Sequence, residues 1–284
     1  MKLIDGKAIA EKVKDSIAKN IYELSGPRPN LAIILAGDRE DSALYVSLKE
    51  REAKKVGIDT HLYRLNNQDN AADLLALIDF LNHDDSIDGI LVQLPLPDKF
   101  NTEQIIAALD PQKDVDGFCP NHPDYVLSPV LAAISASLDY TRVDYKNKKA
   151  LVLYNSEVFG DSVVELLAAR GLETESISAQ DFNKLDDQTA EALYQKISAA
   201  GEEADVLVTA LGLPHFVKAE VLKAGATVID IGITKVEGKV LGDVDQIAAA
   251  KKVAWLTPVP GGIGPMTIAF LFKNVWEIFK RRQK

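Results

Sequence analysis

The chain has 284 residues, of which 47% are hydrophobic and 26% are charged, and its formal net charge is −10. These values are typical of a folded globular protein with room for one large domain or two ordinary ones, and they exclude a disordered chain. The negative balance argues against nucleic acid as a main partner, because phosphate binding needs clustered Lys and Arg side chains.

The first half of the chain predicts alternating helices and strands. Apolar residues recur at helical spacing over residues 7–24, and a short apolar run over 31–36 precedes a glycine, as in a buried strand. The pattern then predicts a helix at 42–56, a strand at 59–65, a helix at 70–82, a strand at 89–94 and a helix that begins at Asn101. This order predicts a mostly parallel sheet with helices on both faces.

Residues 110–128 interrupt the alternation. The segment is polar, contains prolines and lacks regular apolar spacing, so it is either a junction between domains or a binding loop. Ser128 and Pro129 then begin a helix that runs to about residue 139.

A second alternation follows and predicts a second α/β region. Its expected elements are a strand at 150–154, a helix at 161–170, a strand at 173–178, a helix at 187–200, strands at 205–209 and 227–231, a hairpin around 236–240, a strand at 253–256 and a last helix at about 265–281.

Cysteine usage and the start of the chain indicate the compartment. The one cysteine, Cys119, excludes an intrachain disulfide and a cysteine-based zinc site, and is typical of a reducing compartment. No apolar run approaches the length of a membrane span, and residues 1–7 lack a signal-peptide core. We therefore expect a cytoplasmic protein with no membrane partner.

Tyr45 and Lys49 lie four residues apart in a predicted helix and therefore on one face. One interpretation is a surface lysine beside a half-buried tyrosine. The other is an aromatic platform for a flat ligand, with an ammonium group over its reacting end and a hydroxyl from Ser42 one turn earlier. Burial against a ligand lowers the pKa of a lysine, which suits it to proton transfer.

Gln93 ends a predicted strand, at the edge where open α/β folds bind ligands; the alternative is a solvated strand end. Asp114 and Asp116 flank Val115, and alternate residues of an extended segment face the same way. Such a pair can bind a metal or accept paired N–H donors from a heterocycle, or it can form an Asx-type turn. No other carboxylate or histidine cluster has matching spacing, so no metal site is expected.

Residues 154–162 stand where a dinucleotide-binding loop is expected, between the first strand and helix of the second alternation. The segment contains Gly160, but it lacks a glycine at 154 and any Lys or Arg, while Glu157 and Asp161 bring carboxylates to where phosphates would lie. By themselves these residues favour an ordinary turn from strand to helix.

The run 258–267 holds three glycines and three prolines in ten residues and precedes the last helix. It is either a tight turn between domains or a stretch of backbone that borders a ligand closely.

Together these motifs resemble the bifunctional methylenetetrahydrofolate dehydrogenase/methenyltetrahydrofolate cyclohydrolase family, the FolD type. The sequence is similar to the family's signatures at 45–49, 88–97, 113–118, 230–233, 242–245 and 258–267. The resemblance implies two three-layer α/β domains around a cleft, the second of them Rossmann-like. The implied folate and catalytic domain comprises residues 1–128 and 265–284, and the implied NAD(P)-binding domain comprises residues 129–264.

The resemblance also implies a homodimer that acts on tetrahydrofolate derivatives. It would oxidise 5,10-methylenetetrahydrofolate with NADP or NAD and hydrolyse the methenyl product to 10-formyltetrahydrofolate. Lys49 would act on the proton at the attacked carbon, Gln93 would orient it, Tyr45 would stack on the aminobenzoyl ring and Asp116 would pair with the pterin N–H groups. The other implied site residues are Ser42, Pro260, Gly261 and Gly262 for the substrate and Asn155, Ser156, Gly160 and Ile233 for the cofactor.

The cofactor loop departs from the family pattern. The family loop usually begins Gly-Arg-Ser or Gly-Ala-Ser, whereas this chain has Tyr154, Asn155 and Ser156 there. The missing glycine and arginine leave the approach of a pyrophosphate and the choice between NADP and NAD open. Two alternatives to the bifunctional enzyme therefore remain: a cyclohydrolase without dehydrogenase activity, and a non-catalytic protein that binds folate or a partner.

Overall fold

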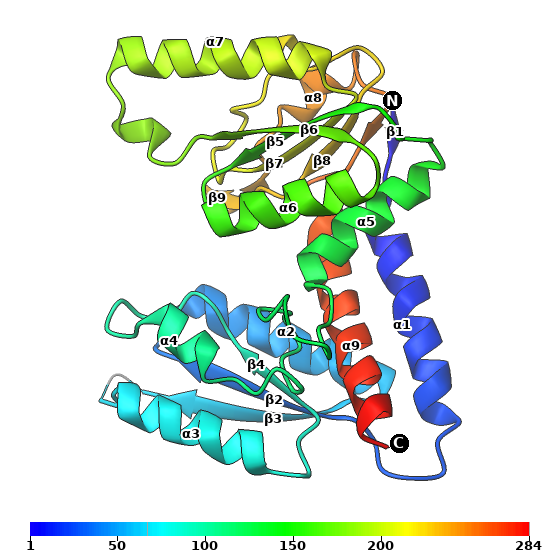
Figure 1. The fold of residues 1–284 in the computed structure, drawn as a ribbon, viewed down its shortest axis with the longest axis vertical. Helices are drawn as coiled ribbons and strands as arrows, with labels where there is room; N and C mark the ends of the chain where they lie inside the picture. Colours follow the sequence, from blue (N-terminus) through cyan, green and yellow to red (C-terminus); the bar gives the residue numbers. More distant parts are fainter. Residues whose placement is uncertain (67, 284) are drawn as a thin grey trace. The chain divides into compact units, whose positions relative to one another are not determined.

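The computed structural model describes residues 1–66 and 68–283, and Figure 1 labels its helices and strands. The chain divides into two compact units. The first unit comprises Ala10–Pro129 and Thr267–Lys284, and the second unit comprises Met1–Ile9 and Val130–Met266. Each unit is built on its own parallel sheet, as the two alternations in the sequence predict.

The first unit has helices on both faces of a three-stranded sheet. Strands β2 (Asn30–Ala36), β3 (Asp59–Leu65) and β4 (Gly89–Val92) are parallel in the order β3-β2-β4. The helices are α1 (Gly6–Tyr22), α2 (Glu40–Val56), α3 (Ala71–His83), α4 (Thr102–Ala107) and α9 (Ile263–Arg282).

Successive residues of β2 enter two different cores. Leu31 and Ile33 pack with apolar residues of α1, α2 and α9. Ala32 and Ile34 pack with those of α3 and α4. Because side chains alternate along a strand, a continuous apolar run such as β2 is what a sheet covered on both faces requires.

The second unit is built on a six-stranded parallel sheet in the order β1-β11-β8-β7-β5-β6. The strands are β1 (Lys2–Leu3), β5 (Lys149–Tyr154), β6 (Glu173–Ser178), β7 (Val206–Ala210), β8 (Thr227–Asp230) and β11 (Trp255–Leu256). This arrangement confirms the predicted α/β class with a Rossmann-like second part.

Helices and a hairpin complete the second unit. Figure 1 shows α6 and α7 on opposite faces of the sheet. The helices are α5 (Pro129–Thr141), α6 (Glu157–Ala169), α7 (Asp187–Glu203) and α8 (Gln246–Ala249), with short 3₁₀ turns at Phe182–Lys184 and Ala219–Val221. The expected hairpin is present as β9 (Thr234–Val236) and β10 (Lys239–Leu241), with positive φ at Glu237 and Gly238 as its turn requires.

The start of the chain lies in a different unit from the one expected. The family resemblance implies that residues 1–9 belong to the first domain, whereas they cluster with the second unit. The reason is β1, which pairs with β11 and is held by hydrogen bonds from the Lys2 and Ile4 N–H groups to the carbonyl oxygens of Ala254 and Leu256. A two-residue strand has no periodic signal that the sequence could show.

Two boundaries near the sheet edges also differ from expectation. The strand predicted at 89–94 ends at Val92, and the helix predicted at 161–170 begins at Glu157. Only Asn155 and Ser156 therefore connect β5 to α6, so most of the predicted loop at 154–162 is helical. Within residues 1–66 and 68–283, none of the helices is both long and apolar enough to cross a bilayer.

We predict that Gly6→Ala lowers the free energy of unfolding by about 1–3 kcal/mol, because a Cβ at Gly6 would overlap the carbonyl oxygen of Gly262. Urea unfolding measures this difference. Gly26→Ala is the matched control, since a Cβ there meets no described atom within 4 Å and should be neutral or slightly stabilising. Equal stability of the two variants would contradict the close packing at Gly6.

Candidate active site

Helix α2 carries Tyr45 and Lys49 on one face of the first unit. Val46 and Ala53 of this helix are fully buried, which fixes the orientation of the helix on the sheet. Gly57 ends the helix in a left-handed conformation, with φ of 86° and its N–H bonded to the Ala53 carbonyl oxygen. Tyr45 stays 43% exposed and Lys49 is half-buried, so an aromatic ring and an ammonium group border the same surface.

Gln93 lies directly after β4 and holds Lys49. The Gln93 backbone N–H donates to the Ile34 carbonyl oxygen at 2.9 Å, which continues the sheet by one residue. Its side-chain nitrogen donates to the Leu94 carbonyl oxygen at 2.6 Å, and its Oε1 accepts from Lys49 Nζ at 2.9 Å. Because a lysine ammonium only donates, the amide can have only this orientation while the contact is present.

Asp116 reaches the same place along a segment that runs beside β4. The Ile90 N–H donates to the Lys113 carbonyl oxygen at 2.8 Å, and Ile90 and Asp114 form a parallel bridge. Two residues farther on, the segment has reached Asp116, while β4 has reached its end. The carboxylate of Asp116 there interacts electrostatically with Lys49.

Asp114 fixes the path of this segment. Its carboxylate is buried and accepts backbone N–H bonds from Asp116, Gly117, Phe118 and Cys119, at 2.6–3.2 Å. From the other side, Asn274 of α9 donates to the carbonyl oxygens of Val115 and Leu127, both at 2.9 Å.

The carboxylates of Asp114 and Asp116 have different partners, because the first is bonded to backbone N–H groups and the second interacts with Lys49. The Asx-type alternative describes Asp114, because its carboxylate accepts four backbone N–H bonds. Of the two carboxylates, that of Asp116 is the one available to a ligand. No group of three or more His, Cys, Asp or Glu side chains that could hold a metal ion is present in the described part of the chain.

Lys113 is a buried cation with a structural role that the sequence pattern did not indicate. Its Nζ donates to the carbonyl oxygens of Leu81 and Asp84, at 2.8 and 2.7 Å, and so satisfies the end of α3. Burial lowers the pKa of Lys113. A lysine directly before an Asp-x-Asp-Gly pattern gave no signal that it is structural.

Burial and mutual attraction oppose each other at Lys49 and Asp116. Burial lowers the pKa of Lys49, and the nearby Asp116 carboxylate works against this by favouring the ammonium form. Burial raises the pKa of Asp116 to about 6; Lys49 lowers it and Asp114 adds to the rise. Both groups therefore titrate closer to neutral pH than their exposed counterparts, as groups that move protons do.

The other expected substrate residues are less directly placed. Ser42 is buried on the packed stripe of α2, so its role as a substrate ligand stays a prediction. Pro260, Gly261 and Gly262 belong to the second unit, and Gly261 has a φ of 108° that disfavours any other residue. Their part in a substrate site also remains a prediction.

The second unit has a topological switch point at β5. From β5 the chain goes through α6 to β6 on one side, and then through α7 to β7 on the other side. Ligands of doubly wound sheets bind at such a point, beyond the carboxyl ends of the strands. Asn155 bridges the two sides, since its Nδ2 donates to the Leu211 carbonyl oxygen beyond β7 at 2.9 Å.

Gly160 allows α6 to pack closely on β5. A Cβ at Gly160 would lie 2.6 Å from ring carbons of Tyr154, the last residue of β5. The Ser156 side chain makes no capping hydrogen bond within the described residues, so the first turn of α6 keeps N–H groups for a ligand or water.

Two buried carboxylates that the sequence analysis did not single out anchor the neighbouring loops. Asp243 accepts from Thr209 Oγ1 and from the N–H groups of Leu211 and Leu213, at 2.7–3.0 Å. Asp230 accepts the N–H groups of Gly232, Asp243 and Val244, at 3.0–3.1 Å. Burial raises the pKa of Asp230 to about 7. The loop that they fix includes Ile233, which is 48% exposed.

Comparison with known proteins decides the family. A model of the catalytic domain of tetrahydrofolate dehydrogenase/cyclohydrolase matches residues 4–116, and a model of the NAD(P)-binding domain of the same enzymes matches residues 129–283. This chain belongs to the tetrahydrofolate dehydrogenase/cyclohydrolase family.

Relatives of the family match along the whole chain. The bifunctional protein FolD of Lacticaseibacillus casei (strain BL23) is 38% identical, and the match covers 98% of each chain. The crystal structure of the bifunctional FolD enzyme from Campylobacter jejuni has a TM-score of 0.90 at 34% identity, over 99% of each chain. The FolD enzyme of Trypanosoma brucei, complexed with NADP cofactor and inhibitor, has a TM-score of 0.89 at 30% identity, over 100% of this chain and 98% of that chain.

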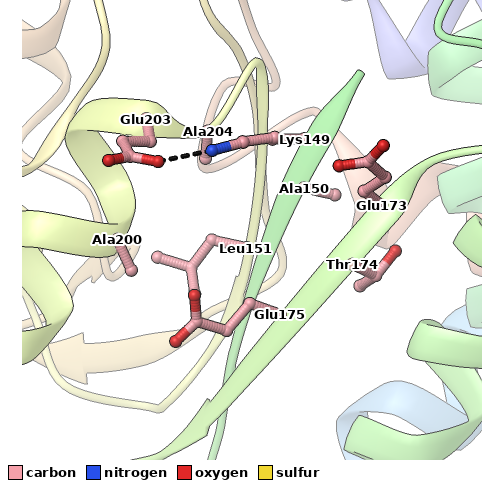
Figure 2. Close-up of a pocket in the computed structure, with 9 residues that line it drawn as sticks. All are labelled: Lys149, Ala150, Leu151, Glu173, Thr174, Glu175, Ala200, Glu203 and Ala204. Carbon is pink, nitrogen blue, oxygen red and sulfur yellow. Dashed lines mark hydrogen bonds and ion pairs between the residues drawn. The ribbon is translucent and has the colours of Figure 1, made fainter. Parts of the chain in front are cut away.

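The NAD(P)-binding domain also has a pocket at the opposite edge of its sheet. Figure 2 shows this pocket at the amino ends of β5 and β6, where Lys149 pairs with Glu203 at 2.5 Å and Glu173 and Glu175 project beside it. Dinucleotides bind at the carboxyl edge, so this acidic pocket is not where the family's cofactor is expected.

The backbone at the carboxyl edge fits the pyrophosphate that NAD and NADP share, whereas the carboxylates of Glu157 and Asp161 in α6 oppose it. The switch point, the uncapped N-terminus of α6 and the close approach at Gly160 are the features a dinucleotide-binding βα turn needs. The residues that could hold it are Asn155, Ser156, Gly160 and Ile233, as the family resemblance predicts.

We predict that Asp116→Asn stabilises the protein by about 1–3 kcal/mol at pH 7.5 and has little effect near pH 4. The pKa of Asp116 is raised from 3.8 to about 6, so the folded protein retains a proton that the unfolded chain releases. The stability contributed by this group is therefore present below pH 4 and is lost as the pH rises through 6. Urea unfolding at the two pH values measures the difference.

Asp15→Asn is the control, because Asp15 is exposed on α1 and its replacement should be neutral at both pH values. A destabilised Asp116→Asn variant at pH 7.5 would show that Asp116 is not held in a costly ionised state.

Proposed function

We propose that this chain oxidises 5,10-methylenetetrahydrofolate to the methenyl form with NADP or NAD and then hydrolyses that product to 10-formyltetrahydrofolate. The observation that carries the proposal is the Lys49 ammonium, which is bonded to the Gln93 oxygen at 2.9 Å and attracted electrostatically by the Asp116 carboxylate. A protein that only binds folate has no need for a lysine whose pKa is lowered by burial.

Hydrolysis requires two proton movements that Lys49 can serve. Water adds to the methenyl carbon, and one of the two carbon–nitrogen bonds of that carbon then breaks. A proton must leave the attacking water, and a proton must reach the departing nitrogen. Because burial lowers the pKa of Lys49, its amine is neutral more often than that of an exposed lysine and can accept and return a proton.

Tyr45 and Asp116 supply recognition of the folate. The exposed ring of Tyr45, one turn before Lys49 on α2, offers a face for stacking on the aminobenzoyl ring. The Asp116 carboxylate can accept two N–H groups from the amino end of the pterin in a bidentate contact. Pairing with these donors would also replace the hydrogen bonds to water that the Asp116 carboxylate loses on burial.

A bound NAD or NADP would supply the hydride acceptor for the oxidation. The protein's own contribution there is to orient the cofactor through the backbone of the Asn155–Ser156 turn and the first turn of α6.

A second candidate is hydrolysis without oxidation. One argument for it is Tyr154, which stands where the family usually has a glycine and whose ring lies against Gly160. The other is the pair of carboxylates, Glu157 and Asp161, at the start of α6. Nucleotide titration separates the two candidates, because a hydrolase alone gains no stability from either nucleotide.

The assembly we propose is a homodimer, as in the family resemblance. The hairpin of the second unit offers an apolar surface for it, since Val236 and Val240 are 39% and 37% exposed. The cytoplasmic location remains a prediction from composition.

We predict that Lys49→Met reduces hydrolysis of methenyltetrahydrofolate by at least about 100-fold, because the proton carrier is lost while the apolar stem is kept. The decay of methenyltetrahydrofolate absorbance with purified protein measures the rate. Lys54→Met is the matched control on the same helix, since Lys54 is exposed and its replacement should leave the rate unchanged. An unchanged rate in Lys49→Met would support the non-catalytic alternative.

A further inference from the structure

The fold indicates where the adenosine ribose of a dinucleotide would lie. In doubly wound folds an acidic residue at the end of the second strand bonds the ribose 2′-hydroxyl of NAD, whereas a nearby arginine accommodates the 2′-phosphate of NADP. The second strand here is β6, which ends at Ser178. The Ala179 N–H still bonds to the Tyr154 carbonyl oxygen at 2.8 Å, so the end of β6 is level with the end of β5.

Asp181 is the acidic residue that follows this strand. It comes about 20 residues after Gly160, the spacing typical of the ribose-binding acid. Asp181 is exposed, makes no capping bond to the 3₁₀ turn that it precedes within the described chain, and has a φ of 57°. Its Oδ1 lies 2.7 Å from the Nζ of Lys184, so the charge of this lysine is already paired.

The described residues of β5 and α6 offer no free cation to a 2′-phosphate. Glu157 lies in the first turn of α6 and Asp161 in the next, and residues 150–169 contain no Lys or Arg. Arg170, at the far end of α6, is paired with Asp139 and hydrogen-bonded to Ser135. A phosphate monoester carries nearly two negative charges at neutral pH and gains most of its binding from cations.

We infer that this dinucleotide site selects NAD over NADP, with Asp181 as the residue that determines the specificity. The inference rests on the proposed dehydrogenase function. The Asp181 carboxylate accepts a hydrogen bond from the ribose 2′-hydroxyl of NAD, and it both repels the 2′-phosphate of NADP and occupies Lys184. This sets the chain apart from its Trypanosoma brucei relative, whose structure holds NADP.

Calorimetric and thermal titration of the full chain with each nucleotide tests the inference. We expect NAD to bind about tenfold more tightly than NADP and to raise the midpoint of thermal unfolding at lower concentration. In Asp181→Asn we expect about fivefold weaker binding of NAD and about fivefold stronger binding of NADP, because Lys184 is released. Asp181→Ser should shift the preference in the same direction.

Glu173→Gln is the control, because it removes one carboxylate at the start of β6, at the edge of the sheet opposite to Asp181, in the pocket of Figure 2. It should leave both affinities unchanged. The inference would be overturned if NADP bound as tightly as NAD. It would also be overturned if the Asp181 and Glu173 variants had the same affinities for the two nucleotides. Either result would leave the proposed function intact. If neither nucleotide bound, the inference and the dehydrogenase half of the proposed function would both be overturned. The hydrolysis test with Lys49→Met is independent of this result.

Discussion

The first unit is organised around one interaction. The half-buried Lys49 ammonium is bonded to the Gln93 amide and attracted by the Asp116 carboxylate, and the surrounding segments hold these groups in place. Burying a charge is costly unless it is paired, so each partner has to be held firmly. The sheet holds Gln93 through its backbone N–H, and the Asp114 carboxylate holds the turn that carries Asp116. The site is therefore made of side chains that have little freedom to separate, which is what a preorganised catalytic site requires.

Much of the fold follows from local pattern. Strand β2 is an unbroken apolar run because both of its faces are covered, and the hairpin at β9–β10 has residues that accept positive φ at its turn. What the local pattern missed depends on contacts that are distant in sequence. Strand β1 exists only because β11 lies beside it, and the early start of α6 leaves two residues between β5 and α6, whereas the predicted strand at 150–154 and helix at 161–170 leave six.

The candidate site divides in the same way. Helical spacing predicts that Tyr45 and Lys49 share one face of a helix. The position of Gln93, a polar residue directly after an apolar strand, indicates a site at the edge of the sheet. The different roles of Asp114 and Asp116 depend on the backbone path of their turn, which Asn274 of a remote helix helps to fix. Asp230 and Asp243 likewise acquire their partners only when separate loops meet at one sheet edge. A polar residue in an otherwise apolar helix face, such as Asn274, is a sequence signal of such a contact.

A titration of the Asp116 side-chain carboxyl by carbon-13 NMR, in the unaltered protein and in Lys49→Met, tests the central contact most directly. The structure predicts a pKa of about 6 in the unaltered protein and a higher one when the lysine charge is removed, because burial then acts without its main opposing attraction. A pKa near the ordinary aspartate value in both proteins would mean that the two groups do not share a buried site, and the proposed folate chemistry would lose its basis.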